Sequence, residues 1–386
     1  MKIAIDAVGI RGHGGAAVLC ELLLWLPKVR PDWEWHVFTF NRKLREFDDP
    51  AVSEKVTFEH TACGNSGILR LWWVSHILPK RLHEVKADVL FSFANMAPSR
   101  PRLPQVVYCH QAYAFFSDAL SKQPLFQRLR LLVMRYQILR GARVSRAMIV
   151  QTDVMCQRIL ELEPSLSGRI QVIPSGYRTP LETLIIRPEK KALIDNASQP
   201  RLTYVSHPGR SKNHLALVRA MPAILKKFPS VSLLLTLDKQ RSTQTLYDLL
   251  VTEILQEAEA LGVSKNIVWL GVLNSDEVTY ALQSSDLMVF PSLAESFGLG
   301  LVEAMAAGCP IAVSDLTYAH DVCGDAAVYF SPSPESIAET VVNTCSDQAV
   351  LLRLRNCGAE RKACFSYQKI AEDLACVLEK ALRDVK

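Results

Sequence analysis

Residues 289–315 read VFPSLAESFGLGLVEAMAAGCPIAVSD. The apolar run Leu287–Phe290 just before the proline is typical of a buried strand. An apolar helix-forming segment then runs to Gly308, with Pro310 two residues beyond it, which indicates a helix end. A second apolar run, Ile311–Val313, predicts another strand. Such a strand–loop–helix–strand unit is typical of a parallel α/β sheet.

Two glutamates bracket the predicted turn between strand and helix. Glu295 lies in the loop, and Glu303 lies eight positions on, inside an otherwise apolar helix. Open α/β sheets bind ligands at the carboxyl ends of their strands, and the free N–H groups of a helix start favour phosphate. A buried carboxylate needs a partner, and hydroxyl groups of a sugar or ribose supply one. The bland alternative is that Glu303 is an exposed helix residue, but its neighbours are apolar.

This stretch resembles the donor-binding signature of the retaining family-4 glycosyltransferases, which have the GT-B fold. The matching features are a proline, a Glu-Ser-Phe-Gly loop, a second glutamate after seven intervening residues, and Ala-x-x-x-Gly-x-Pro. The resemblance implies an α/β chain of two doubly wound Rossmann-like domains facing across a cleft. It also implies that Glu295 holds donor-sugar hydroxyls, that Glu303 holds the ribose, and that the donor is further bound by Ser296, Phe297, Gly298 and Leu299.

The composition of the whole chain is that of a globular protein with room for two domains. It has 386 residues, of which 49% are hydrophobic and 22% charged. No apolar run approaches the roughly 18 residues that a membrane span needs, and the amino terminus reads as a strand, not as a signal peptide. Ten scattered cysteines without a Cys-x-x-Cys pair favour a reduced, cytoplasmic protein without structural zinc. The net charge of +5 does not indicate nucleic acid as a partner.

Strand-like apolar runs alternate with helix-length segments in two successive series, which predicts two parallel sheets. The segment Pro174–Pro200 between the series is the predicted linker, and the resemblance implies that the last helix returns to the first domain. We therefore expect a first domain at residues 1–180 with helix 366–386, and a donor domain at 181–365. The predicted strands are Lys2–Asp6, Trp35–Phe40, Asp88–Phe93, Gln105–Cys109, Ala147–Gln151, Ile170–Ile173, Arg201–Ser206, Val231–Leu237, Ile267–Leu270, Leu287–Phe290, Ile311–Val313 and Ala327–Phe330.

A glycine-rich segment follows the first predicted strand. Its Gly12-x-Gly14-x-x-Ala17 pattern formally satisfies the dinucleotide fingerprint of a dehydrogenase. That fingerprint also requires a carboxylate at the end of the second strand, where this chain has Phe40-Asn41-Arg42, so we disfavour a dinucleotide cofactor and expect none. The resemblance instead implies that Gly14 and Gly15 let backbone approach the donor phosphates.

Four further residues match, or nearly match, functional positions of the family. His110 ends a predicted strand, where the family has a histidine that binds the donor sugar. The family grips the donor diphosphate with an arginine just after a strand and a lysine just before a helix. Lys212 fits the lysine position, while His207 stands at the arginine position and Arg210 three residues later. Either Arg210 reaches in from the loop or His207 replaces the arginine.

The chain contains no Asp-x-Asp sequence. Enzymes that hold a sugar-nucleotide diphosphate through a divalent cation generally need clustered carboxylates, because hard cations prefer oxygen ligands. We therefore expect no catalytic metal, with Lys212, Arg210 and a helix terminus neutralising the leaving group.

Residues 125–146 contain six arginines and no acid. One apolar stripe at helical spacing is predicted to face the sheet: Phe126, Leu129, Val133 and Tyr136. A second stripe, Leu131, Met134 and Ile138, is flanked by Arg128, Arg130 and Arg135, and a similar mixture joins Trp72 and Trp73 to Arg70, Lys80 and Arg81. Basic residues around exposed apolar ones suit an anionic membrane surface. The alternative is a helix packed on both sides, with its arginines paired.

Together these features predict a retaining, metal-independent hexosyltransferase that uses a nucleotide diphosphate sugar. The expected acceptor is a glycan or lipid-linked hydroxyl in bacterial envelope polysaccharide or glycolipid synthesis, and the protein is expected in the cytoplasm, peripheral on the inner face of the membrane. The alternative function is a non-catalytic nucleotide-sugar-binding subunit of a glycosyltransferase complex, because the arginine position holds His207.

Overall fold

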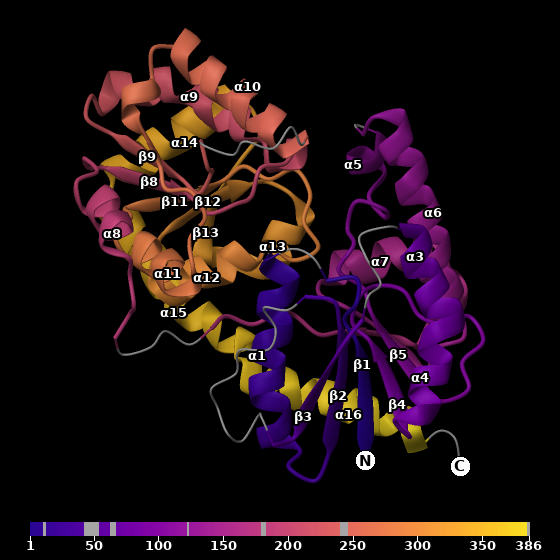
Figure 1. Cartoon of the computed structure of the whole chain (residues 1–386). Coiled ribbons are helices and arrows are strands. Elements are labelled where there is room, and N and C mark those ends of the chain that lie inside the picture. Colours follow the sequence, from indigo (N-terminus) through magenta and orange to yellow (C-terminus); the bar gives the residue numbers. More distant parts are fainter. Residues whose placement is uncertain are drawn as a thin grey trace. The chain divides into compact units, whose positions relative to one another are not determined.

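The computed structural model describes residues 1–10, 13–41, 54–61, 67–121, 123–178, 183–239 and 246–383. The chain divides into two compact units (Figure 1). The first unit comprises Met1–Gly176 and Phe365–Lys386, and the second comprises Tyr177–Cys364. Within the described ranges, no helix combines the length and apolarity needed to cross a membrane.

The first unit is built on a seven-stranded sheet in the order β3-β2-β1-β4-β5-β6-β7, in which every pair of neighbours is parallel. Strands β4, β5 and β6 are buried along their whole length, as expected for a sheet covered on both faces. The strands are β1 Lys2–Asp6, β2 Glu34–Thr39, β3 Val56–His60, β4 Val89–Ser92, β5 Gln105–Tyr108, β6 Ala147–Val150 and β7 Ile170–Val172.

Helices cover this sheet, and the last helix of the chain is one of them. Helix α16 buries one face, including Ile370, Leu374 and Leu378, and it contacts α1, β4 and β5 (Figure 1). The described helices of this unit are α1 His13–Val29, α3 Gly67–Trp72, a π-helical turn Trp73–Ile77, α4 Leu78–Glu84, α5 Ser117–Ser121, α6 Leu125–Ala142, α7 Asp153–Leu162, a 3₁₀ turn Pro164–Leu166 and α16 Tyr367–Arg383.

A buried ion pair closes the carboxyl end of β1. Asp6 is fully buried, and both of its carboxylate oxygens accept hydrogen bonds from Arg70, at 2.9 and 2.6 Å. The indole Nε1 of Trp73 donates to the same carboxylate at 3.2 Å. Arg70 and Trp73 are therefore core residues, and the prediction that they belong to an exposed basic and aromatic surface is wrong. Trp72 is exposed.

The orientation of α6 also differs from the prediction. The stripe expected to face the sheet is exposed: Phe126, Leu129, Val133 and Tyr136. The second stripe packs inward instead, because Ile138 is buried and Leu131 and Met134 pack against the same core. An exposed apolar stripe does lie next to the arginines of α6, but it is the stripe that was predicted to face the sheet.

The second unit carries a six-stranded sheet in the order β10-β9-β8-β11-β12-β13, again parallel throughout. Its strands are β8 Arg201–Tyr204, β9 Ser232–Leu235, β10 Ile267–Trp269, β11 Leu287–Phe290, β12 Ile311–Ser314 and β13 Ala327–Phe330. Its described helices are α8 Pro188–Asp195, a 3₁₀ turn Arg210–Lys212, α9 His214–Lys227, α10 Leu246–Ala260, a 3₁₀ turn Ser264–Asn266, α11 Ser275–Gln283, α12 Leu299–Ala307, α13 Thr317–Cys323, a 3₁₀ turn Gly324–Ala326, α14 Pro334–Ser346, α15 Gln348–Arg361 and a 3₁₀ turn Lys362–Phe365 that crosses into the first unit.

The prediction of two parallel α/β sheets is confirmed, and each predicted strand overlaps an observed one. One strand was not predicted: β3, at the edge of the first sheet. Its residues, Val-Thr-Phe-Glu-His, contain no continuous apolar run like those of the other strands, and only Val56 is buried.

Candidate functional site

The site in the second unit is formed by two loops that the sheet places next to each other. Strands β8 and β11 are hydrogen-bonded neighbours, so the loops after their carboxyl ends meet. The backbone N–H of Leu293 donates to the carbonyl of Ser211 at 2.7 Å, and the hydroxyl oxygen of Ser292 lies 3.2 Å from the same carbonyl oxygen. These contacts fix one loop against the other.

This junction brings Lys212 and Glu295 together. The Lys212 Nζ lies 2.5 Å from Glu295 Oε1, and the Ser292 hydroxyl donates to the same oxygen at 2.7 Å. The two side chains are only 11% and 13% exposed. The attraction within a charge pair this well shielded from water is stronger than within a surface pair. Two of the predicted site residues, Lys212 and Glu295, are therefore in direct contact with each other.

The start of α12 lies directly after this pair. Gly298 has φ +92°, a left-handed conformation that a side chain would strain, and no side chain caps the helix. Helix starts leave backbone N–H groups without intrahelical partners. A Cβ at Gly300 would lie 3.1 Å from the methyl carbon of Met288, so this turn packs closely on β11. Phe297 is buried, while Ser296 and Leu299 are partly accessible.

Glu303 lies in the second turn of α12. Burial raises the pKa of its carboxyl group to about 7, because the charged form loses its hydration. Among the residues that the structure describes, no hydrogen bond or ion pair to Glu303 is found. A carboxylate in this position is ready to accept hydrogen bonds from ligand hydroxyls.

The two candidates for the second cation lie differently. Arg210 is exposed, and its Nη2 lies 4.0 Å from Oε2 of Glu253 on α10. His207 is also exposed. Neither is fixed next to Glu295 as Lys212 is.

His214, the first residue of α9, was not among the predicted site residues. It is buried, and neither ring nitrogen has a hydrogen-bond partner within the described ranges. Burial, then the nearby Lys212 charge, lowers the pKa of His214 to about 3, so the ring is neutral. The ring packs 4.8 Å from that of Tyr204, whose hydroxyl donates to the Lys212 carbonyl at 3.0 Å. His214 and Tyr204 thus support the turn that carries Lys212.

The remaining predicted residues lie in the first unit. His110 follows β5, and its backbone N–H donates to Oδ1 of Asn95 at 2.6 Å. Burial lowers the pKa of His110 to about 3, and its buried Nε2 has no partner among the described residues. Gly14 and Gly15 lie in the first turn of α1, and a Cβ at Gly14 would meet no atom within 4 Å.

Residues 199–347 match the family described as Glycosyl transferases group 1. The uncharacterized glycosyltransferase MJ1607 of Methanocaldococcus jannaschii is 34% identical over 153 residues, which are 38% of this chain and 34% of that protein. A D-inositol 3-phosphate glycosyltransferase of Corynebacterium jeikeium is 24% identical over 284 residues, 70% of this chain and 66% of that protein. The matched regions thus span between about a third and two thirds of these relatives.

The structural similarity to a solved protein extends over nearly the whole chain. The crystal structure of Anabaena Alr3699/HepE in complex with UDP-glucose superposes with a TM-score of 0.71 at 17% identity, covering 98% of this chain and 100% of that one. This similarity and the two parallel sheets confirm the predicted GT-B fold. The prediction that the domains face across a cleft stays a prediction.

Proposed function

We propose that this chain, whose residues 199–347 match the family of group 1 glycosyltransferases and whose fold is GT-B, transfers a hexose-type sugar from a nucleotide diphosphate to an acceptor hydroxyl. The observation that carries the proposal is the shielded Lys212–Glu295 pair beside the uncapped start of α12. A diphosphate placed at this helix start meets free N–H groups and an ammonium. Its sugar then meets a carboxylate.

The pair has a chemical logic for glycosyl transfer. As the bond between sugar and diphosphate breaks, negative charge grows on the phosphate oxygen and positive charge on the sugar ring. Lys212 stabilises the first, while Glu295 holds the sugar hydroxyls. Because these groups are already fixed against each other and against Ser292, little reorganisation is needed at the moment of reaction.

Glu303 is proposed to bind the ribose of the donor. Two vicinal ribose hydroxyls would supply the hydrogen bonds that its carboxylate lacks, and they would favour the charged form over the protonated one. His110 is proposed as a ligand of the donor sugar, because a neutral imidazole with a free Nε2 accepts a hydroxyl hydrogen bond.

Retention at the anomeric carbon and independence of metal are part of this proposal. The support for retention is the resemblance of residues 291–310 to retaining family-4 enzymes. The support for metal independence is that a lysine and a helix start are available to carry the charge of the leaving group.

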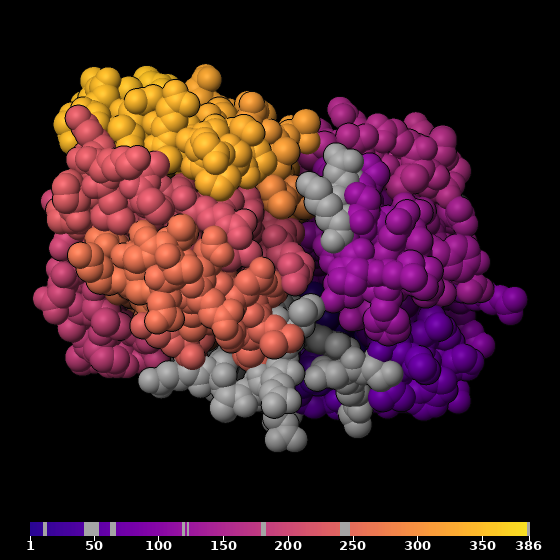
Figure 2. Space-filling model, turned by 90° about the horizontal axis from the view of Figure 1, so that it is seen from above, coloured from indigo at the N-terminus to yellow at the C-terminus, as the bar shows by residue number. Residues whose placement is uncertain are grey.

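Peripheral membrane attachment is proposed from the surface of the first unit. Leu125, Phe126, Leu129, Val133 and Tyr136 form an exposed apolar stripe on α6, here called the α6 stripe, and Arg128 and Arg130 flank it. The amino end of α6, uppermost in the first unit in Figure 1, faces the reader in Figure 2. Such a combination fits an anionic lipid surface and thereby a lipid-linked or envelope acceptor.

The experiment that tests the function is a two-stage assay of the purified chain. A thermal-shift screen with UDP, GDP and ADP identifies the base, since a ligand that binds the native state raises its melting temperature. The corresponding nucleotide sugars are then followed for slow hydrolysis without acceptor. We expect one base to stabilise the chain and one of its sugars to be released, and less so in Glu295→Gln. Stabilisation without turnover of any sugar would favour the alternative, a non-catalytic nucleotide-sugar-binding subunit.

A further inference from the structure

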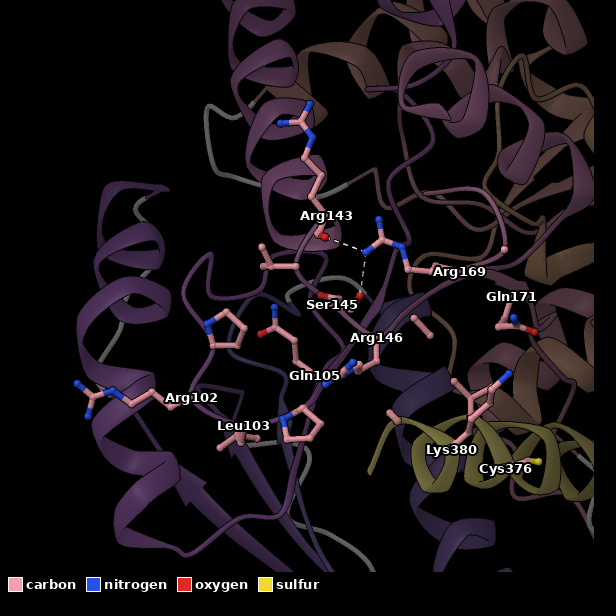
Figure 3. Close-up of a pocket in the computed structure, with 17 residues that line it drawn as sticks. Arg102, Leu103, Gln105, Arg143, Ser145, Arg146, Arg169, Gln171, Cys376 and Lys380 are labelled. Carbon is pink, nitrogen blue, oxygen red and sulfur yellow. Dashed lines mark hydrogen bonds between the residues drawn. The ribbon is translucent and has the colours of Figure 1, made fainter. Parts of the chain in front are cut away.

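A cavity of about 780 Å³ lies in the first unit at the amino ends of β5, β6 and β7 (Figure 3). Gln105 begins β5 and Ala147 begins β6, while Cys376 and Lys380 of α16 line the cavity from another side. His110 follows the carboxyl end of β5. The cavity therefore lies at the opposite end of the strand from that candidate residue, and every residue that lines it belongs to the first unit.

The lining of this cavity is strongly basic. Five cationic residues line it and no aspartate or glutamate does: Arg102, Arg143, Arg146, Arg169 and Lys380. A concentration of one sign of charge in a hollow raises the local concentration of the opposite ion. The cavity therefore favours an anion.

Two of the five cations already have partners. Arg143 donates from Nε to Oε2 of Glu163 at 2.7 Å. Arg169 donates to backbone carbonyls, from Nη1 to Arg143 at 2.8 Å and from Nη2 to Ser165 at 2.7 Å. These two guanidinium groups hold the loop after α6 in place and thus build the wall of the cavity.

Arg146 and Lys380 are the cations available to a ligand. Both are exposed, and neither forms a hydrogen bond through its side chain or an ion pair with any residue that the structure describes. In Figure 3, Arg146 lies centrally beside Gln105, Lys380 rises from α16, and Arg102 extends away from both. A phosphate group accepts hydrogen bonds from Arg and Lys together, and such charge-assisted bonds are about twice as strong as neutral ones.

Gln105 is a buried polar residue of the cavity wall. Gln105 is 1% exposed, and its Nε2 donates to the Pro98 carbonyl at 2.9 Å. Its Oε1 is buried without a partner among the described residues. Gln105 therefore belongs to the wall of the cavity, and its Oε1 is shielded from the ligand by the surrounding side chains.

We propose that this cavity is a binding site for a phosphate-bearing ligand, with Arg146 and Lys380 on the phosphate. The ligand is either a free organic phosphate or the headgroup of an anionic lipid, which offer the same chemistry. The inference does not rest on the proposed transferase activity, because the donor residues Lys212 and Glu295 lie in the second unit.

The reactivity of the Cys376 thiol can report ligand binding in this cavity. Cys376 lines the cavity and is exposed, and Cys364 is exposed but does not line it. The rates at which iodoacetamide, an uncharged reagent, modifies the two thiols are followed by peptide mass spectrometry. Inorganic pyrophosphate is the probe, with KCl at equal ionic strength as the reference. We expect pyrophosphate at twice its Kd to slow modification of Cys376 about threefold, in proportion to occupancy, and to leave Cys364 unchanged.

Variants that each remove one positive charge show which residues are responsible for the protection of Cys376. Arg146→Gln and Lys380→Gln should each reduce the protection of Cys376, and the double variant should abolish it. Lys369→Gln removes the same charge from an exposed position of the same helix outside the cavity and should retain full protection. Lys212→Ala should retain it too, which separates this site from the donor site.

A second arm distinguishes the two sources of phosphate. Vesicles of phosphatidylcholine with phosphatidic acid are compared with vesicles of phosphatidylcholine alone. Protection by pyrophosphate supports a free organic phosphate, and protection by the acidic vesicles alone supports a lipid headgroup. The proposal is overturned if KCl slows the reaction as much as either probe, or if protection persists in the Arg146→Gln/Lys380→Gln double variant.

Discussion

At the scale of single residues, Lys212 and Arg210 are two positions apart and nevertheless lie in different surroundings. They sit in a 3₁₀ turn, where residues repeat every three positions, so positions i and i+2 project to different sides. Lys212 lies against Glu295, and Arg210 lies near Glu253. The difference gives the clearest test of which cation serves the leaving group.

Lys212→Ala should reduce kcat/KM more than Arg210→Ala does, by at least about 1 kcal/mol of transition-state stabilisation, or roughly fivefold. The reason is that only Lys212 is fixed beside Glu295 and the start of α12. Steady-state kinetics with the donor identified by the thermal-shift screen measures both variants. A larger loss in Arg210→Ala would mean that the loop rearranges on donor binding and that Arg210 takes the arginine position of the family.

Substitution of Glu303 and of Glu295 should change different kinetic parameters. Glu303→Ala should raise KM for the donor about tenfold with little change in kcat, because ribose contacts are the same in ground and transition states. Glu295→Ala should lower kcat on the order of 100-fold, because it removes a contact to the reacting sugar. Measurement of both parameters for both variants decides the matter, and identical effects on KM and kcat would contradict the assignment.

Burial of Glu303 also predicts a pH dependence of stability. Its folded pKa of about 7 lies above the ordinary value of 4.5, so the native state binds the proton more tightly than the unfolded chain. Its contribution is therefore most favourable below pH 4.5 and is lost as the pH rises through 7. Glu303→Gln should have a melting temperature that falls less than that of the wild type between pH 5 and 8.

Melting curves by circular dichroism at several pH values measure this difference. His110 and His214, whose pKa values are lowered, act in the opposite direction, but they are common to both proteins. Parallel curves for wild type and Glu303→Gln would show that Glu303 is hydrated in the native state.

At the scale of elements, α6 carries the surface that is proposed to bind a membrane. If the α6 stripe docks on anionic lipid, Arg128→Gln/Arg130→Gln should reduce sedimentation with anionic liposomes at low salt. Each basic residue near such a surface contributes about 1 kcal/mol, which salt screens. Lys226→Gln/Lys227→Gln on α9 removes the same charge from exposed positions of the second unit and serves as the control. A wild type that never sediments would point to a protein partner and a soluble acceptor.

The same helix shows where inference from sequence ends. Periodicity identified both apolar stripes of α6, yet both are apolar enough to be core, and only packing decides that Ile138 points inward and Phe126 outward. Edge strand β3 was missed because its short sequence, Val-Thr-Phe-Glu-His, holds no continuous apolar run, which was the pattern used to find the other strands. His214 was missed because its environment depends on Tyr204, which precedes it by ten residues in another element. By contrast, strands buried on both faces are continuous apolar runs, and these were predicted correctly.

At the scale of the whole molecule, we expect sugar transfer to need no divalent metal ion. Sugar transfer should survive EDTA with no more than about a twofold change, since Lys212 and the start of α12 are proposed to take the place of a divalent ion. The assay compares initial rates after dialysis against EDTA and after addition of Mg²⁺ or Mn²⁺. Loss of activity that either ion restores would contradict metal-independent departure of the diphosphate.

Helix α16 has a consequence for how the chain matures on the ribosome. The second unit, Tyr177–Cys364, is continuous in sequence, whereas the first also includes Phe365–Lys386, which are made after the second unit. Until α16 emerges, the faces of α1, β4 and β5 that it covers stay open to water and to other nascent chains. All residues of the second unit therefore leave the ribosome before the first unit is complete, and a chaperone would find its substrate in the first unit.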